Sequence, residues 1–562
     1  MTHLWDLIRR ALRPDTALHL PGEGRSVPAV ELITGAESTA AGIVAELGGT
    51  QPKRLGLLAD NGEPWVRGLF ATFRLDAAVV PLPLPAAFAG PDAYVGHLAR
   101  IARDAELDAI LVNPGFARRT VDRLAQALPG IALIDITEAG DRQALPPSDY
   151  RGGDAEAVIQ YTSGSTSHPK GVVLSHDNVA AGLATINDAI QWLPEDVLGL
   201  WLPLFHDMGL FSLLSSFVRG SAVCLWSPSE FVRRPMKWLG SFAASPATAL
   251  PAPNFFYDYL VAAAAKQGVP DGLDLSGWRL GSNGAEPVQR RTIEAFAEMF
   301  GPYGARPELI CPTYGMAEAT LMVSYSGTGT QARILDVDRD QLDVGRPIQL
   351  AAQGKERTRA VVSCGPAAGS VRFRTAEEDG TPLADDVVGE IQITGPPVTR
   401  GYLGLPPERQ PFTPDGWLRT GDLGFVHDGE LYVVGRSKDM IVVRGQNYYA
   451  EDVEEIVRTT PGVNGRRGAA FAWADGEEER MAVLWETSAD PAESAAIGAA
   501  ICERLAARLG LLAVQVVPVA PSTIPFTSSG KVKRTSAIEL CRKTGLLDTA
   551  GSVTRIPEGL SR

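Results

Sequence analysis

A loop rich in hydroxyl groups and glycine could hold a polyphosphate. It lies in QYTSGSTSHPKGVVLSH (160–176), directly after an apolar run that predicts a strand. Small residues let the backbone approach the anion, and hydroxyl and amide groups supply the donors that it needs. The candidate phosphate cradle consists of Thr162, Ser163, Gly164, Ser165, Thr166, Lys170 and Gly171.

The loop departs from the P-loop pattern GxxxxGK[ST]. Pro169 stands where the second glycine belongs, and Gly171 stands where the Ser or Thr belongs. A flexible turn of serine and glycine remains the alternative for the loop taken alone. Its chemistry therefore depends on the residues that accompany it.

Buried strands and helices must position this loop. Between Leu55 and Ile134, apolar runs such as RLGLLAD and AILVNP alternate with helix-like stretches such as DAYVGHLARIARDAEL, and the alternation returns after Ala157. The pattern predicts an α/β region with buried parallel strands. Later runs such as VGEIQITG and GELYVVGR are separated by glycines and short turns, which predicts antiparallel strands.

Two further segments complete the organisation. From 326 to 360 the chain is polar and lacks a clean period, so we expect an irregular insertion. After Lys438, AEDVEEIVRTT and PAESAAIGAAICERLAARLG predict amphipathic helices around strands at AVLWE and VQVVPV. We predict a large N-terminal domain (1–436) of α/β subdomains plus a β-rich subdomain, and a small α+β C-terminal domain (437–562).

Length and composition exclude several classes of protein. The 562 residues, 45% apolar and 21% charged, predict a soluble multidomain protein. A net charge of −14 disfavours nucleic acid as a partner. The five scattered cysteines form no CxxC pair and indicate reduced thiols in the cytoplasm. We expect neither export nor membrane insertion, because signal-peptide and membrane-spanning patterns are missing.

The candidate cradle is one of six motifs that occur together. The combination resembles the acyl- and aminoacyl-adenylating superfamily of acyl-CoA ligases, luciferases and nonribosomal peptide adenylation domains. The resemblance implies ATP and Mg²⁺ as cofactors, and a mobile C-terminal domain that turns about a hinge at Lys438. The motifs are YTSGSTSHPKG (161–171), NGAEPV (283–288), TYGMAEA (313–319), RTGDLG (419–424), GRSKDMIVVRG (435–445) and TSSGKVKR (527–534).

Within that superfamily, WLPLFHDMGL (201–210) and PAPNFFYDYL (251–260) resemble fatty acyl-AMP ligases more than generic CoA ligases. The connection between Glu318 and Gly365 is also longer than the corresponding one in CoA ligases. It resembles the insertion of fatty acyl-AMP ligases, which hinders domain rearrangement or CoA access. A surface loop without a function is the alternative, since loops tolerate changes in length.

Attack of a carboxylate on the α-phosphorus of ATP brings two anions together, so catalysis requires cations and hydrogen-bond donors. The resemblance makes Lys531 the lysine that bridges the carboxylate and the α-phosphate; taken alone it would be a solvated surface charge. It also makes Glu318 the magnesium ligand and places Thr166 near the ion or the departing phosphates. Without the resemblance, Glu318 could equally be an acidic side chain in the first turn of a helix, where it interacts favourably with the helix dipole.

The nucleotide contacts follow from the same resemblance. Asp422 matches the aspartate that accepts from both ribose hydroxyls, and Arg436 matches an arginine that holds the ribose. The alternative for Asp422 is an aspartate that only stabilises a turn. Tyr314 is expected against one face of the adenine, with the backbone of 284–286 against the other. The remaining contacts are expected from Asn283, Gly284, Ala285, Glu286, Thr313, Gly315, Met316 and Ala317.

His206 matches a position that lines the carboxylate entrance. There it could orient the carboxylate or offset its charge, although a lone histidine is often structural. Aromatic and methionine side chains nearby could line a tunnel for the acyl chain, or could simply belong to the hydrophobic core. The candidates for this tunnel lining are Phe205, Met208, Phe211, Phe255 and Phe256.

Three functions are open to the sequence. The leading hypothesis is ATP-dependent formation of acyl-AMP from a fatty acid, followed by transfer to an acyl carrier protein. The alternatives are an acyl-CoA ligase and a non-catalytic acyl- or nucleotide-binding protein, although intact catalytic motifs disfavour the latter. Carrier proteins are typically acidic, so their docking needs a basic surface, for which the candidates are Lys533, Arg534, Arg542 and Lys543.

Overall fold

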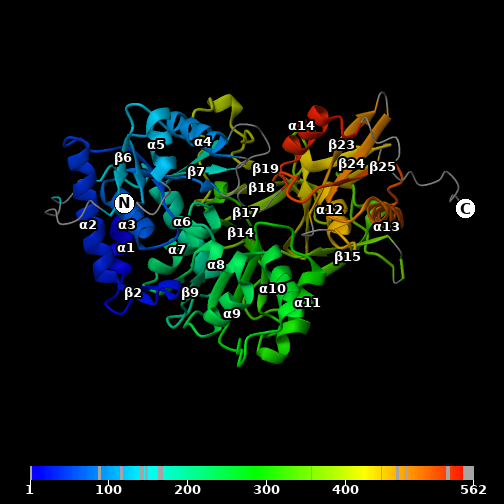
Figure 1. Ribbon diagram of the computed structural model, residues 1–562, viewed down its shortest axis with the longest axis horizontal. Coiled ribbons are helices and arrows are strands. Elements are labelled where there is room, and N and C mark those ends of the chain that lie inside the picture. Colours follow the sequence, from blue (N-terminus) through cyan, green and yellow to red (C-terminus); the bar gives the residue numbers. More distant parts are fainter. Residues whose placement is uncertain are drawn as a thin grey trace, which may run out of the picture.

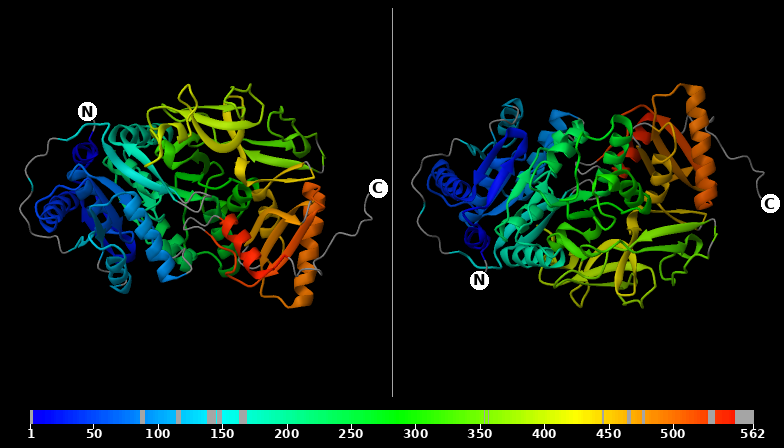
Figure 2. Two further views of the ribbon diagram at one scale, coloured as in Figure 1. Left: turned by 90° about the horizontal axis from the view of Figure 1, so that it is seen from above. Right: turned by 90° about the horizontal axis from the view of Figure 1, so that it is seen from below.

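The chain folds into two large mixed sheets, a β-rich region and a smaller C-terminal unit (Figure 1). The N-terminal helices and the elements that follow residue 440 lie at opposite ends of the molecule (Figures 1 and 2). The computed structural model describes residues 3–85, 90–113, 118–137, 145, 150–162, 169–352, 354–355, 357–444, 446–463, 467–475, 478–526 and 532–547.

The first sheet has six strands in the order β6-β5-β3-β4-β7-β8. All neighbours are parallel except β7 and β8, which form an antiparallel edge. Parallel strands are covered on both faces, which explains the nearly continuous apolar runs that predicted them. The strands are β3 (Arg54–Leu58), β4 (Ala78–Pro81), β5 (Ala109–Val112), β6 (Ala132–Asp135), β7 (Glu156–Thr162) and β8 (Lys170–Ser175).

The second sheet has eight strands in the order β14-β13-β12-β11-β9-β10-β1-β2. It is parallel from β13 to β1 and antiparallel at both edges. Ligands of such sheets bind beyond the carboxyl ends of the parallel strands. The strands are β1 (Ala17–Leu20), β2 (Arg25–Pro28), β9 (Leu198–Leu200), β10 (Val223–Leu225), β11 (Ala249–Pro253), β12 (Leu280–Gly284), β13 (Ile310–Gly315) and β14 (Met322–Tyr325).

Helices pack on both sheets and join them through one continuous core. Helix α6 begins at a capping box, in which Asn178 N–H donates to the Ser175 hydroxyl at 3.1 Å. The helices are α1 (Leu4–Ala11), α2 (Ala29–Glu46), α3 (Glu63–Arg74), α4 (Pro91–Asp104), α5 (Arg118–Ala127), α6 (His176–Ala189), α7 (Asp207–Phe217), α8 (Pro228–Arg233), α9 (Pro235–Ala243), α10 (Asn254–Gln267) and α11 (Arg290–Phe300).

The β-rich region is a four-stranded antiparallel sheet of β17 (Arg372–Ala376), β18 (Gly389–Thr394), β19 (Leu418–His427) and β20 (Glu430–Arg436). The expectation of an irregular insertion before it was wrong in part. Within the expected irregular segment, strand β15 (Ile334–Asp338) pairs antiparallel with β16 (Thr358–Val362). Each strand buries only two residues at one end, which is too few for an alternating pattern to be recognised in the sequence.

The C-terminal unit is α+β, as the periodicity predicted. Strand β23 pairs antiparallel with β24, and β24 pairs parallel with β25. The long helix α13 connects β24 to β25 and packs on β25. A second core of aliphatic and aromatic side chains fills this unit. Its elements are β21 (Met440–Val443), β22 (Gln446–Tyr449), α12 (Ala450–Arg458), β23 (Gly468–Asp475), β24 (Glu478–Glu486), α13 (Pro491–Leu509), β25 (Val514–Val519) and α14 (Arg534–Thr544).

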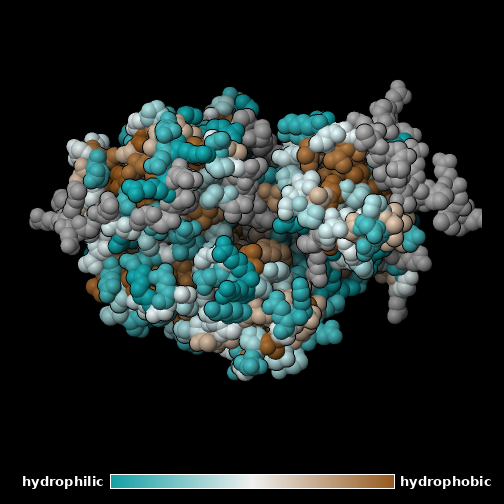
Figure 3. Space-filling view, in the orientation of Figure 1, coloured by the Kyte–Doolittle hydropathy of each residue, from teal (hydrophilic) through white to brown (hydrophobic). Residues whose placement is uncertain are grey.

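Hydrophilic residues cover much of the face in Figure 3, and apolar residues appear there as separate patches. Among the described residues, we find no helix whose length and apolar character would suffice to cross a bilayer. All five cysteines are buried free thiols.

Candidate active site

Two side chains that the motifs singled out, Tyr314 and Arg436, meet at a third, Asp422. Asp422 on β19 lies opposite Arg436 on β20 in the antiparallel ladder, and Arg436 Nε is 3.0 Å from Asp422 Oδ1. The Tyr314 hydroxyl, at the end of β13, donates to Asp422 Oδ2 at 2.7 Å. The strand register therefore brings together residues that are far apart in the sequence.

Burial and charge tune this cluster. Burial, followed by the charge of Asp422, raises the pKa of Tyr314 well above its usual value, so the phenol stays protonated and donates. The Asp422 charge is the main cause that raises the pKa of Arg436. The cluster thus holds one buried carboxylate between a neutral donor and a fixed cation.

Glu318 lies in a short 3₁₀ turn (Ala317–Ala319) after β13 and is 7% exposed. Its Oε1 accepts from the Tyr402 hydroxyl at 2.6 Å, and its backbone carbonyl accepts from Thr399 N–H at 2.7 Å. Burial raises the pKa of Glu318, and the Tyr402 hydrogen bond opposes that rise.

A hard divalent cation fits this carboxylate. Mg²⁺ binds through one or two carboxylates together with phosphate oxygens, and a carboxylate offers about four lone-pair sites, of which Tyr402 uses one. The Asp207 carboxylate also acts electrostatically on Glu318. The donor set therefore suits magnesium held jointly by Glu318 and a polyphosphate.

The backbone after β12 is shaped for a close approach. Ala285 has φ +64°, the left-handed region that side chains other than glycine seldom adopt. A Cβ on Gly284 would come within 2.9 Å of the Thr313 carbonyl, so only glycine fits there. Met316 N–H donates to the Leu321 carbonyl at 2.7 Å, which folds the chain back after β13.

Two predicted nucleotide residues make structural bonds instead of facing open space. Asn283 is fully buried, and its Nδ2 donates to Asn254 Oδ1 at 3.2 Å. Glu286 Oε2 accepts from Phe255 N–H at 2.9 Å, at the start of α10. Both side chains tie the loop after β12 to α10, so a nucleotide would meet the backbone of this loop.

An apolar cavity of about 70 Å³ joins the predicted nucleotide residues to the interior. The cavity lies among β11, β12, α6 and α7, and its lining residues are Ile186, Ile190, Trp192, Leu198, Asp207, Met208, Ser212, Ser215, Ala249, Leu250, Pro251, Leu280, Ser282, Gly284, Ala285, Thr313, Gly315, Leu321 and Met322.

Of the residues predicted to line the acyl tunnel, Met208 lines this cavity. Phe211 is fully buried in the core, and Phe255 and Phe256 pack on Trp201 with ring centroids 6.1 and 5.3 Å away. The Phe205 carbonyl accepts from Gln160 Nε2 at 2.9 Å. None of the four phenylalanines belongs to the described lining of the cavity.

His206 directly precedes α7, with its ring centroid 4.5 Å from that of Phe205. Its neighbour Asp207 lines the cavity and was missed, although it belongs to the same HDMG motif. Tyr402 was also missed, because no spacing in the sequence relates it to Glu318. Lys438 is exposed in a short 3₁₀ turn between β20 and β21.

Part of the predicted site falls outside the described residues. Thr162 pairs with Lys170 at the mouth of the β7–β8 hairpin, and Lys170 is exposed. The loop between these two positions and the predicted catalytic lysine are not described; the residues concerned are Ser163, Gly164, Ser165, Thr166 and Lys531.

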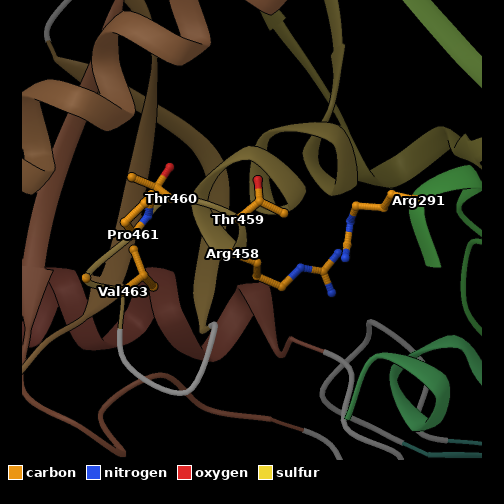
Figure 4. Close-up of a pocket in the computed structure, with 7 residues that line it drawn as sticks. Arg291, Arg458, Thr459, Thr460, Pro461 and Val463 are labelled. Carbon is orange, nitrogen blue, oxygen red and sulfur yellow. The ribbon is translucent and has the colours of Figure 1, made fainter. Parts of the chain in front are cut away.

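A larger cavity, of about 310 Å³, lies between α11 and the turn after α12 (Figure 4). In Figure 4 the side chains of Arg291 and Arg458 extend toward each other from its two sides. Residues 459–463 complete the lining. No residue that the motifs predicted lines this cavity, so volume alone does not locate the chemistry.

Comparison with known proteins gives concordant matches. The family model of the AMP-binding enzyme matches residues 9–403. The chain is 37% identical over 517 residues to a medium-chain-fatty-acid–[acyl-carrier-protein] ligase of Moorena producens (88% of this chain, 86% of that protein). It is 31% identical over 537 residues to a long-chain-fatty-acid–AMP ligase of Mycobacterium marinum (88% of each). A structure from a study of fatty acyl-adenylate ligases from E. coli and L. pneumophila superposes with a TM-score of 0.88 at 28% identity, covering 97% of this chain and 98% of that one.

Proposed function

The chain belongs to the AMP-binding enzyme family, and we propose that it uses ATP to convert a fatty acid into acyl-AMP, with release of pyrophosphate. The meeting of Tyr314 and Arg436 at Asp422, together with Glu318 and an adjoining apolar cavity, carries the proposal. A polar nucleotide site that opens into apolar space suits ATP on one side and an acyl chain on the other.

In the proposed reaction, a carboxylate oxygen of the fatty acid attacks the α-phosphorus of ATP, and the bond from that phosphorus to the pyrophosphate oxygen breaks. Asp422 accepts from the ribose hydroxyls, Arg436 helps to hold the ribose, and the Tyr314 ring lies against the adenine. Lys531 neutralises charge on the attacking carboxylate and the α-phosphate. The hydroxyl loop 162–166 holds the departing phosphates.

Magnesium is the proposed cofactor, held by Glu318 with Thr166 nearby. When bound, it supplies positive charge that balances the phosphate oxygens. The burial of Glu318 supports this assignment, because an adjacent cation stabilises a buried carboxylate in its charged form.

We further propose that residues 1–436 bind ATP and the acid, that residues 437–562 deliver Lys531, and that Lys438 is the hinge. The proposed acceptor is an acyl carrier protein, with CoA as the alternative. The name of the Moorena producens relative supports the carrier protein. The cytoplasm is the proposed location, which suits five free thiols.

The expected basic docking surface needs one correction. Arg534 is already paired within the chain, because its guanidinium lies 3.0 Å from Asp439 Oδ2 and 2.9 Å from Glu454 Oε2 and its side chain is only 17% exposed. Arg542 and Lys543 are exposed on α14 and remain candidates.

ATP–pyrophosphate exchange with a series of fatty acids tests the proposed function. The wild type is expected to exchange, and Lys531→Ala is expected to lose about a hundredfold or more in rate, since it removes charge stabilisation from the transition state. Circular dichroism should be unchanged. Near-normal exchange in this variant would remove Lys531 from the chemistry, and no exchange by the wild type with any carboxylic acid would leave the non-catalytic alternative.

A further inference from the structure

Tyr402 lies between two parts of the proposed site that come from different segments of the chain. It forms an isolated bridge with Val172 on β8, and the next residue, Leu403, donates its N–H to the Gly171 carbonyl at 2.8 Å. The loop around Tyr402 is therefore fixed to β8 directly after the candidate phosphate cradle.

The backbone of Tyr402 is clamped by one side chain. Gln410 Oε1 accepts from Tyr402 N–H at 2.8 Å, and Gln410 Nε2 donates to the Tyr402 carbonyl at 3.0 Å. Gly401 has φ +142°, and a Cβ there would come within 2.5 Å of the Gln410 amide. Gly401 and Gln410 together thus hold the Tyr402 backbone in one position.

The two ends of the Tyr402 side chain face different partners. The hydroxyl donates to Glu318 Oε1 at 2.6 Å, a length typical of a charge-assisted hydrogen bond. The Lys170 ammonium lies 5.1 Å from the centroid of the ring, within cation–π range. One side chain therefore connects the buried carboxylate to the lysine that closes the phosphate loop.

We propose that Tyr402 is a positioning residue for metal binding: its hydroxyl fixes the orientation of the Glu318 carboxylate, and its ring holds Lys170 beside the polyphosphate. The inference rests on the proposed function, in which Glu318 is the magnesium ligand. Partners that orient a metal-ligating carboxylate commonly change metal affinity tenfold or more when they are removed.

Tyr402→Phe separates this role from a structural one. It removes the hydroxyl bond to Glu318 and keeps the ring over Lys170 and the backbone clamp of Gln410. The dissociation constant of a non-hydrolysable ATP analogue is measured on the full-length protein in EDTA and in Mn²⁺. The constant in EDTA reports the nucleotide site itself. The constant in EDTA divided by the constant in Mn²⁺ reports how much the metal strengthens binding.

We expect Tyr402→Phe to lower the Mn²⁺-dependent ratio about tenfold while leaving the constant in EDTA unchanged. In a Glu318→Gln background the same substitution should add little, because the hydroxyl acts through the carboxylate. Gln410→Ala is the control for loop position, and we expect it to reduce the ratio less than Tyr402→Phe does.

An unchanged ratio in Tyr402→Phe, or an equal loss in the Glu318→Gln background, would overturn the inference and leave the proposed function intact. Equal losses in Tyr402→Phe and Gln410→Ala would assign Tyr402 to the loop alone and also overturn it. Failure of the wild type to bind the analogue in either condition would overturn the proposed function and this inference together.

Discussion

At the scale of single residues, Asp422 organises the nucleotide side of the proposed site. Its two oxygens are divided between Tyr314 and Arg436, and the ladder between β19 and β20 sets Asp422 opposite Arg436. Backbone register, which is stiffer than a side-chain rotamer, thus fixes the carboxylate before a ribose arrives. Preorganisation of this kind lowers the entropy lost on binding.

Asp422→Asn should weaken the use of ATP. The amide nitrogen can only donate, so the variant loses accepting capacity and the charge that faces Arg436. Hydrogen bonds to charged groups contribute about 1.5–3 kcal/mol, so we expect kcat/KM for ATP in pyrophosphate exchange to fall about 10–100-fold. Tyr314→Phe is the matched control, because it removes only the hydroxyl bond to Asp422. Equal losses in both variants would contradict a direct contact between Asp422 and ATP.

The motifs pointed to Tyr314, Asp422 and Arg436 because each lies in a short segment, TYGMAEA, RTGDLG or GRSKDMIVVRG, that resembles the adenylating superfamily. They could not locate Tyr402, whose contact with Glu318 exists only through the tertiary path of its loop. They also could not show that the Asn283 amide nitrogen donates to Asn254, because hydrogen-bond partners that are remote in the sequence are a property of the fold. Residue types predict chemistry, and packing decides which of them are free to perform it.

At the scale of elements, helix α1 is anchored through the residue that precedes it. His3 Nε2 lies 3.2 Å from Asp76 Oδ1, and Arg151 Nε donates to Asp76 Oδ2 at 2.8 Å. His176 Nε2 lies 3.6 Å from the same carboxylate. His3, Asp76 and His176 are close enough to suggest a metal site.

The tautomer of His176 argues against a metal there. Leu4 N–H donates to His176 Nδ1 at 3.3 Å, so in the neutral ring the proton lies on Nε2, which faces Asp76. A metal would need the lone pair of that nitrogen. Burial acts to raise the pKa of Asp76, but hydrogen bonds from His176, His3 and Arg151 outweigh it and bring the pKa well below its usual value.

Asp76→Asn should loosen α1. Removing one partner of a buried ionic cluster costs about 3–5 kcal/mol, so we expect faster hydrogen exchange in residues 4–11 of the full-length protein at pH 7. A carboxylate whose pKa is lowered by folding stabilises above its unfolded pKa of about 3.9 and loses that contribution as the pH falls. The difference between wild type and variant should therefore shrink below about pH 4.

Asp15→Asn is the matched control, because Asp15 is exposed just after the same helix and pairs with Arg13 at 3.7 Å. It should leave the exchange of α1 unchanged. Equal exchange in wild type and Asp76→Asn at pH 7 would show that the cluster does not anchor the helix.

Long periodic elements were predicted correctly because many residues report the same period, as in α13 and the parallel strands. The β15–β16 hairpin was not, since only its ends are buried. Its stability comes from contacts with elements that are remote in the sequence.

At the scale of the whole molecule, α12 is one of the elements through which the C-terminal unit contacts the rest of the chain. Asp452 accepts from Arg339 at 2.9 Å and forms an ion pair with Arg359 at 2.8 Å; both arginines belong to the hairpin segment. Glu455 accepts from Arg291 on α11 at 3.1 Å. Figure 1 shows β15 beside α12. The insertion and the large α/β region therefore bind the same helix at two separate points.

These contacts supply a physical reason for the prediction that the chain uses CoA poorly. Arg339 and Asp452 are mostly buried, so the bridge is weakly screened by salt. The proposed rotation of the C-terminal unit about Lys438 would require this bridge to break. Within the described part of the chain, no hydrogen bond joins the hairpin to Tyr314, Asp422 or Arg436, so we expect adenylation to persist when the hairpin is removed. A docked carrier protein could still favour the turned arrangement through its binding free energy.

We expect the intact enzyme to form acyl-AMP readily and acyl-CoA poorly, and deletion of residues 327–357 to raise CoA ligation. Arg339→Ala with Arg359→Ala is the milder variant; it removes both hairpin bonds to Asp452 and keeps the segment, so it should raise CoA ligation less. Acyl-CoA formation is compared at equal adenylation rates, with a carrier protein as the parallel acceptor. Because Arg291 still holds Glu455 in both variants, Arg291→Ala should add to the gain. Efficient CoA ligation by the intact protein would show that the hairpin is a passive loop and that CoA is the acceptor.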